Sequence, residues 1–180
     1  MVTELALDLR PGRSVAIVGP SGSGKTTTLL TLAGLLTRQA GTLTLDGHDV
    51  DHLDRHAVAA AVVVGTEDAH VFGTTVLENL RVGRGDLTVP EATAVLARVG
   101  LAEWLVGLPD GLDTVVGPDA RTVSGGERRR LLVARALVSP APLLLVDEPA
   151  EHLDPERADA LVTDLLNDPR GVVVLSLIHI

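Results

Sequence analysis

GPSGSGKT, residues 19–26, fits the phosphate-loop pattern G-x-x-x-x-G-K-[ST] at every fixed position. The short apolar run before it, Ser14–Val18, predicts a buried strand, and the residues from Lys25 to about Leu36 predict a helix. Strand, loop and helix in this order are the context that the motif requires. The backbone N–H groups of such a loop and the helix N-terminus surround phosphate oxygens with positive potential. The sequence therefore predicts a phosphate-binding site here.

The side chains of the loop add a cation and a hydroxyl. Lysine and arginine together number 15, and Lys25 is the single lysine. A chain that otherwise uses arginine for positive charge thus keeps a compact ammonium at this position. In loops of this kind the lysine reaches the β- and γ-phosphates, and the following hydroxyl, here Thr26, ligates Mg²⁺. The predicted nucleotide-binding residues are Gly19, Pro20, Ser21, Gly22, Ser23, Gly24, Lys25, Thr26 and Thr27.

A second apolar run, Leu143–Val146, ends at two acidic residues. In parallel sheets, ligands bind beyond the carboxyl ends of the strands, so these acids are expected beside the phosphate loop. Asp147 is predicted to hold Mg²⁺, directly or through water. Glu148 is predicted to polarise the attacking water, a role worth about 10²–10⁴-fold in rate.

The rest of the chain alternates strands with helices. The predicted further strands lie within 41–47, 59–65 and 172–175, and the predicted helices lie at 75–80, 90–99, 125–137 and from Pro155, capped by Asp154, to about Asn167. This order predicts an α/β fold with a mostly parallel sheet plus an inserted α-helical subdomain. Together with the phosphate loop, it resembles a P-loop NTPase (RecA-like) core. We expect the core over residues 1–67 and 139–180 and the helical subdomain over 68–138.

Composition excludes several classes of protein. The chain has 180 residues, no cysteine and a formal net charge of −9. This size suits one globular domain, and the absence of cysteine excludes a disulfide scaffold. The acidic balance argues against a nucleic-acid partner. The sequence contains no apolar run of the roughly 18 residues that a membrane span needs, and no signal peptide is recognised at its start.

A second glycine motif, Val123-Ser124-Gly125-Gly126-Glu127, precedes the helix at 125–137. Ser124 taken alone is also a plain helix N-cap. In order, however, the chain carries a phosphate loop, S-G-G-E, an apolar strand ending in Asp-Glu-Pro, and H-L-D. This ordered set resembles the ATPase domain of ABC transporters over nearly the whole chain.

The resemblance implies a role for each matching position. Residues 19–27 are similar to the Walker A loop, and 143–147 to Walker B with Glu148 as the catalytic carboxylate. The signature motif is matched by Ser124, Gly125, Gly126 and Glu127, and the D-loop by residues 151–154. Glu67 stands where the family has its Q-loop glutamine; it could still bind Mg²⁺ or a water, but it adds negative charge near the phosphates.

The resemblance also implies partners. In this family two ATPase domains, identical or different, pair head-to-tail and enclose each ATP between one Walker A loop and the other signature motif. Residues 70–80 are similar to the segment by which exporter ATPase domains meet their transmembrane domain. Several stretches are most similar to actinobacterial thiol-reductant (cysteine/glutathione) exporters of cytochrome bd assembly. We therefore expect an ATP-hydrolysing exporter domain at the cytoplasmic face of the bacterial inner membrane, with ATP and Mg²⁺ as cofactors.

Alternatives remain open. The chain could be a non-hydrolysing half of a heterodimeric pair, which Glu67 leaves possible, or a soluble ABC-type ATPase. A GTPase is disfavoured because its guanine-reading N-K-x-D motif needs a second lysine. His179 lies where the family has a switch histidine, but within a final LSLIHI that resembles translated adapter sequence. The upstream aromatic that stacks on adenine is also missing, and we expect a fragment truncated at both ends and lacking its membrane domain.

Two clusters of polar residues invite a functional interpretation. His48, His52 and His56 recur four residues apart with interspersed aspartates, which is a tempting metal pattern. Because they follow a G-x-L-x-L-D-G segment, an exposed connection is the preferred interpretation. Arg128, Arg129 and Arg130 are predicted to form a solvated helix face, and contact of one arginine with the partner domain is the alternative.

Overall fold

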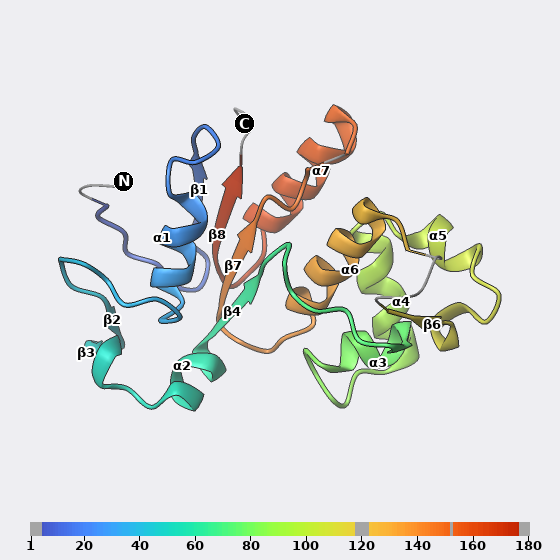
Figure 1. Cartoon of the computed structure of the whole chain (residues 1–180), viewed down its shortest axis with the longest axis horizontal. Helices are drawn as coiled ribbons and strands as arrows, with labels where there is room; N and C mark the ends of the chain where they lie inside the picture. Colours follow the sequence, from blue (N-terminus) through green and yellow to red (C-terminus); the bar gives the residue numbers. More distant parts are fainter. Residues whose placement is uncertain (1–4, 118–122, 152, 177–180) are drawn as a thin grey trace. The chain divides into compact units, whose positions relative to one another are not determined.

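The computed structural model describes residues 5–117, 123–151 and 153–176. The chain divides into two compact units, each with many contacts within itself (Figure 1). The first unit comprises Met1–Val64, Ala141–Glu148 and Thr163–Ile180, and the second comprises Gly65–Pro140 and Pro149–Val162. Residues 149–162 therefore group with the helical unit, whereas the sequence prediction assigned them to the core.

The first unit is built on a four-stranded sheet in the order β1-β8-β7-β4. The strands are β1 (Ser14–Val18), β4 (Val62–Gly65), β7 (Leu143–Asp147) and β8 (Gly171–Ser176). Strand β8 runs parallel to both β1 and β7, and its Leu175 is in register with Ile17 on one side and Asp147 on the other. The α/β fold with a parallel sheet is thus confirmed, and the register brings the end of β7 level with the end of β1.

Helix α1 (Lys25–Leu32) packs on this sheet. Its buried Leu29 joins Leu145, Val173 and Leu175 in one apolar cluster, so the helix that starts at the phosphate loop is anchored to the strands beneath it. The helix ends four residues earlier than predicted. Gly34 adopts a positive φ of 68°, which turns the chain out of the helix at this point.

The segment between α1 and β4 differs from the predicted pattern. Strands β2 (Thr44–Leu45) and β3 (His48–Asp49) form a short antiparallel hairpin, followed by a 3₁₀ turn, η1 (Val50–His52). Helix α2 (Arg55–Ala61) then occupies residues expected to begin a strand. The Asp54 side chain caps this helix by accepting from the His56 N–H at 2.8 Å, and the alanines that follow favour helix, so β4 begins only at Val62.

The second unit is mainly helical. It contains α3 (Val76–Arg81), α4 (Val89–Arg98), α5 (Ala102–Val106), η2 (Gly111–Asp113) and α6 (Gly125–Leu137). A short antiparallel pair, β5 (Thr74–Thr75) with β6 (Val115–Val116), was not predicted. Leu80, Leu96 and Leu131 are fully buried and form part of the core of this unit.

Helix α7 (Pro155–Leu166) begins where the sequence predicts. Asp154 accepts the Arg157 N–H at 3.0 Å, and Pro155 occupies the first helical position, where its missing N–H costs nothing. Among the described residues, no helix has the length and apolar character to cross a membrane.

Candidate functional site

The phosphate loop lies between β1 and α1 in the first unit. Two of its glycines have positive φ angles, 76° at Gly22 and 90° at Gly24. Gly24 caps α1 in the left-handed region, which residues with a side chain rarely adopt. The loop therefore needs glycine at these positions to present the first N–H groups of α1 at its open end.

The Lys25 ammonium is held inside this loop. Its Nζ donates to the carbonyl oxygens of Gly19 at 2.7 Å and Pro20 at 3.1 Å, and the residue is only 7% exposed. The same Nζ lies 3.5 Å from Oε1 of Glu148. A buried ammonium needs such partners, and the phosphates of a nucleotide would compete with Glu148 for it.

Thr26 and Asp147 meet across 121 positions of sequence. The Thr26 hydroxyl donates to Oδ2 of Asp147 at 2.7 Å. The second carboxylate oxygen, Oδ1, is buried and has no hydrogen-bond partner in the part of the chain that the structure describes. An orphaned buried carboxylate oxygen beside a hydroxyl is a donor set that suits a hard cation such as Mg²⁺. The residues predicted to hold the metal in this unit therefore fit it.

Glu148 occupies a strained position directly after β7. Its φ is 46°, which is uncommon for a residue with a side chain, and its N–H donates to the Leu175 carbonyl oxygen at 3.1 Å. Such strain persists only where the surroundings impose it, and it is concentrated at functional sites. Here the turn away from the strand places the Glu148 carboxylate beside Lys25.

The signature segment lies in the second unit, at the start of α6. Ser124 and Glu127 form a capping box: the Ser124 N–H donates to Glu127 at 2.7 Å, and the Ser124 hydroxyl accepts the Glu127 N–H at 3.3 Å. A side chain added at Gly125 or Gly126 would meet open space. The motif is thus both a helix cap and an accessible helix N-terminus, so the two interpretations of Ser124 are compatible.

Glu67 does not stand alone in the second unit. Its carboxylate accepts from the guanidinium of Arg129, which also donates to the carboxylate of Glu151. Arg128 donates to the main-chain oxygens of Glu67 at 2.7 Å and of Ala69 at 2.8 Å. The negative charge expected from Glu67 is therefore balanced within its own unit.

The prediction of a solvated Arg128–Arg130 face is wrong. Arg128 and Arg129 hold the segments just described, and Arg130 donates to the carbonyl oxygens of Gly126 at 3.2 Å and Gly100 at 2.9 Å. Helix α6 packs against α3 and α4, and the half-buried arginines at its start contact neighbouring segments as well as water.

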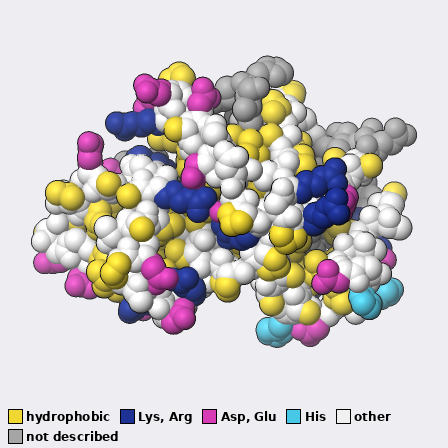
Figure 2. Space-filling view, turned by 180° about the vertical axis from the view of Figure 1, so that it is seen from behind, with side chains coloured by type: hydrophobic (Ala, Val, Ile, Leu, Met, Phe, Trp, Pro, Cys, Tyr) yellow, Lys and Arg dark blue, Asp and Glu magenta, His cyan; other side chains and the backbone are white. Residues whose placement is uncertain are grey.

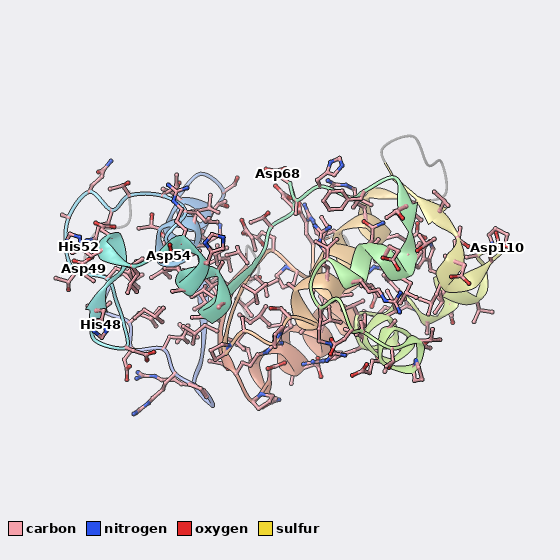
Figure 3. The ribbon with its side chains drawn as sticks, turned by 90° about the horizontal axis from the view of Figure 1, so that it is seen from below. His48, Asp49, His52, Asp54, Asp68 and Asp110 are labelled. Atoms are coloured by element: carbon pink, nitrogen blue, oxygen red, sulfur yellow. The ribbon has the colours of Figure 1, made fainter. Side chains whose placement is uncertain are left out.

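The histidine-rich stretch has structural contacts of its own. Among the described residues, no three His, Cys, Asp or Glu side chains come together as a metal cluster. Histidine side chains lie beside acidic ones at the surface (Figure 2), and Figure 3 places His48, Asp49 and His52 together but Asp54 farther along the chain. Arg38 donates to Asp49 at 2.6 Å, and this hydrogen bond holds the pKa of Asp49 below its ordinary value. The carboxylates near the histidines thus serve the hairpin and the helix cap.

Comparison with known proteins now decides the family. The ABC transporter family model matches residues 2–151. The chain belongs to the ABC transporter family, as its ATP-binding ATPase domain. The phosphate loop and the carboxylates at the end of β7 both lie within the matched residues.

Individual relatives of this ABC ATPase domain differ in cargo. This chain is 46% identical over 172 residues to the mycobactin import ATP-binding/permease protein IrtB of Mycolicibacterium thermoresistibile, and the match covers 93% of the chain. It is 36% identical over 177 residues to the β-(1→2)glucan export ATP-binding/permease protein NdvA of Brucella melitensis, covering 97% of the chain. The chain spans 30% of the length of each of these two relatives.

A solved structure also supports membership of the ABC transporter family. A bacterial Atm1-family ABC exporter with ATP bound superposes with a TM-score of 0.83 at 31% identity, covering 96% of this chain and 31% of that chain. The family and fold expected from the motifs are thus confirmed.

One predicted residue and two observed sets of contacts remain to be compared. His179 lies outside the described residues. The ion pair between Lys25 and Glu148 and the contacts of Arg129 were not predicted, because the sequence motifs place segments near one another but do not specify which side chains pair.

Proposed function

We propose that residues of this ABC ATPase domain divide the reaction as follows. Lys25 and the N–H groups at the start of α1 bind the β- and γ-phosphates of ATP. Thr26 and Asp147 hold Mg²⁺, which when bound neutralises charge on the transferring phosphoryl group. The observation that supports this division is the half-buried Thr26–Asp147 hydrogen bond, together with the second Asp147 oxygen, which has no hydrogen-bond partner among the described residues.

Glu148 is the proposed general base. It accepts a proton from a water whose oxygen bonds to the γ-phosphorus, while the bond from that phosphorus to the ADP oxygen breaks. Its ion pair with Lys25 holds the carboxylate next to the phosphate loop. ADP and inorganic phosphate are the products.

Glu67 is the remaining proposed metal ligand. Its carboxylate contacts Arg129, so a role at Mg²⁺ would require that contact to be given up or shared. Ser124, Gly125, Gly126 and Glu127 are proposed to contact the ATP of a second ATPase domain. The open space at the two glycines supports this proposal, because it lets an anion approach the helix N-terminus.

The domain is proposed to drive a transmembrane partner at the cytoplasmic face of the membrane. Phe72 is 42% exposed, with the His70 ring edge-on to it at 4.8 Å. The Asn79 side chain fixes the backbone of Phe72, because it accepts the Phe72 N–H at 2.9 Å and donates to the Phe72 carbonyl oxygen at 3.0 Å. A rigidly presented, exposed aromatic side chain suits a protein contact.

Export of a thiol such as cysteine or glutathione is the proposed transport, supported by the similar sequence stretches. Import of a siderophore is a second candidate, favoured by the 46% identity to a mycobactin importer. The test is to express the full coding region that contains this domain in membrane vesicles and to follow radiolabelled glutathione, cysteine and iron-loaded mycobactin. ATP-dependent thiol movement that a Glu148→Gln variant lacks supports the proposal. Movement of mycobactin alone contradicts it.

A further inference from the structure

Arg129 joins two carboxylates that lie far apart in the chain. One guanidinium nitrogen donates to Glu67, in the segment after β4, and the other donates to Glu151, in the turn after β7. The Arg129 side chain is 14% exposed, whereas Glu67 and Glu151 are 47% and 36% exposed. All three belong to the second unit. The most buried member is therefore the shared cation at the centre.

The neighbouring residue strengthens one side of this arrangement. Arg128 donates to the carbonyl oxygens of Glu67 and Ala69, at 2.7 and 2.8 Å. The turn they form is closed by the Ala69 N–H, which donates to the Thr66 carbonyl oxygen at 3.3 Å. Consecutive residues of α6 thus hold the side chain and the main chain of a single turn.

The other carboxylate belongs to a second turn. There the Leu153 N–H donates to the Ala150 carbonyl oxygen at 3.2 Å. Glu151 lies inside this turn, and its contact with Arg129 ties the turn to α6. One arginine side chain therefore connects two surface turns to the same helix.

We propose that Arg129 is a positioning residue that clamps the turns at 66–69 and 150–153 to α6, so that both follow the movement of that helix. The proposal rests on the proposed function, in which these turns are the Q-loop and the start of the D-loop and α6 carries the signature motif. A planar guanidinium donates to two separate carboxylates from two nitrogens that its plane holds apart. A lysine offers a single nitrogen, so it bridges two carboxylates only if both turns shift toward that one point.

The arrangement has a distinctive electrostatic consequence. Two carboxylates that share one guanidinium lie close enough to repel each other when the cation is removed. Neutralising Glu67 should therefore loosen its own turn when Arg129 is present. When Arg129 is absent, neutralising Glu67 removes this repulsion and should therefore stabilise the turn that contains Glu151. A merely structural role for either residue would not make the effect of Glu67 on the Glu151 turn depend on whether Arg129 is present.

The test is amide hydrogen exchange on the 180-residue chain, read at the N–H groups of Ala69 and Leu153. Arg129→Met should speed exchange at both amides by about tenfold, the effect of losing a charge-assisted hydrogen bond at each turn. Arg130→Met is the matched control, because Arg130 contacts only main-chain oxygens in the described structure. Equal exchange in the Arg129→Met and Arg130→Met variants would overturn the proposal.

Milder variants keep the test decisive if Arg129→Met fails to fold. Glu67→Gln should speed exchange at Ala69 and leave Leu153 unchanged, and Arg129→Lys should protect both turns less well than Arg129 does but better than Arg129→Met. Adding Glu67→Gln to Arg129→Met should slow exchange at Leu153 relative to Arg129→Met alone. Faster or unchanged exchange at Leu153 in the double variant would contradict the clamp. Faster exchange at both amides in Glu67→Gln would contradict it as well.

Binding of a fluorescent ATP analogue to the same variants separates this proposal from the proposed function. If the wild-type chain binds no analogue while exchange follows the expected pattern, the nucleotide assignment fails and the clamp stands. If the analogue binds and the exchange pattern is absent, only the clamp fails.

Discussion

At the residue scale, the loop lysine shows how the chain uses its charges. Lys25 is the single lysine among 15 basic residues, and its Nζ fits between two main-chain oxygens of the loop. A guanidinium is planar and larger, so it does not fill the same space even though it carries the same charge. The composition and the geometry thus agree on why this position is lysine.

This agreement leads to a prediction about a charge-conserving change. Lys25→Arg should weaken ATP binding by at least about tenfold, because a bulkier cation displaces the loop carbonyls that hold Nζ. Titration of a fluorescent ATP analogue measures the dissociation constant, with Arg13→Lys as a control at an exposed position outside the loop. Affinity equal to that of the wild type in Lys25→Arg would show that charge alone is required.

At the scale of single elements, helix caps account for much of the correct prediction. Helices α6 and α7 begin where Ser124 and Asp154 predict, and β1 matches its predicted bounds. Helix α2 and the β5–β6 pair escaped prediction. Ala59–Ala61 precede an apolar run and share its composition, and two-residue strands carry too little periodicity to recognise.

The cap of α4 gives a pH-dependent prediction. Hydrogen bonds from Thr88 and from Arg84 to the Glu91 carboxylate lower the pKa of Glu91 to about 2. A depressed pKa in the folded state means that the stabilisation is complete above the ordinary value near 4.5 and is lost as pH falls toward 2. The melting-temperature difference between wild type and Glu91→Gln should therefore be constant from pH 7 to about 5 and shrink below it. A difference that grows on acidification would contradict the cap.

Close packing between α3 and α6 gives a second element-scale prediction. A Cβ built at Gly83 would lie 2.3 Å from the main-chain oxygen of Arg135. Gly83→Ala should therefore destabilise the domain by about 1–3 kcal/mol, the usual cost of overpacking. Gly85→Ala is the matched control, since a Cβ there meets nothing within 4 Å. Urea unfolding of both variants measures the difference, and equal stabilities would refute the packing argument.

At the scale of the whole molecule, the motifs in sequence order identified the family, because such an ordered set is specific to it. The Thr26–Asp147 hydrogen bond joins two of them as expected. The charge balance of Glu67 could not be predicted, since it depends on an arginine that follows the signature motif and on a third residue, Glu151. The cargo is not encoded in these motifs, and its identification rests on transport measurements.

Pairing of two domains provides a test at this scale. With MgATP, the wild-type chain of 18.8 kDa should show a mass near twice that value in light scattering. Ser124→Arg should bind ATP yet remain monomeric, because a large side chain at the exposed helix N-terminus blocks the approach of a second domain. Ser124→Ala, which loses the cap but adds no bulk, should still pair. Pairing by Ser124→Arg would contradict the proposed interface.

The most direct measurement of the central claim is phosphate release from MgATP by the wild type and by Glu148→Gln, with ATP binding followed in parallel. We predict that Glu148→Gln binds ATP at least as tightly, because Lys25 loses a competing carboxylate, and releases phosphate about 10²–10⁴-fold more slowly. Chelation of Mg²⁺ should abolish release by the wild type. Phosphate release at the wild-type rate from Glu148→Gln would contradict the account.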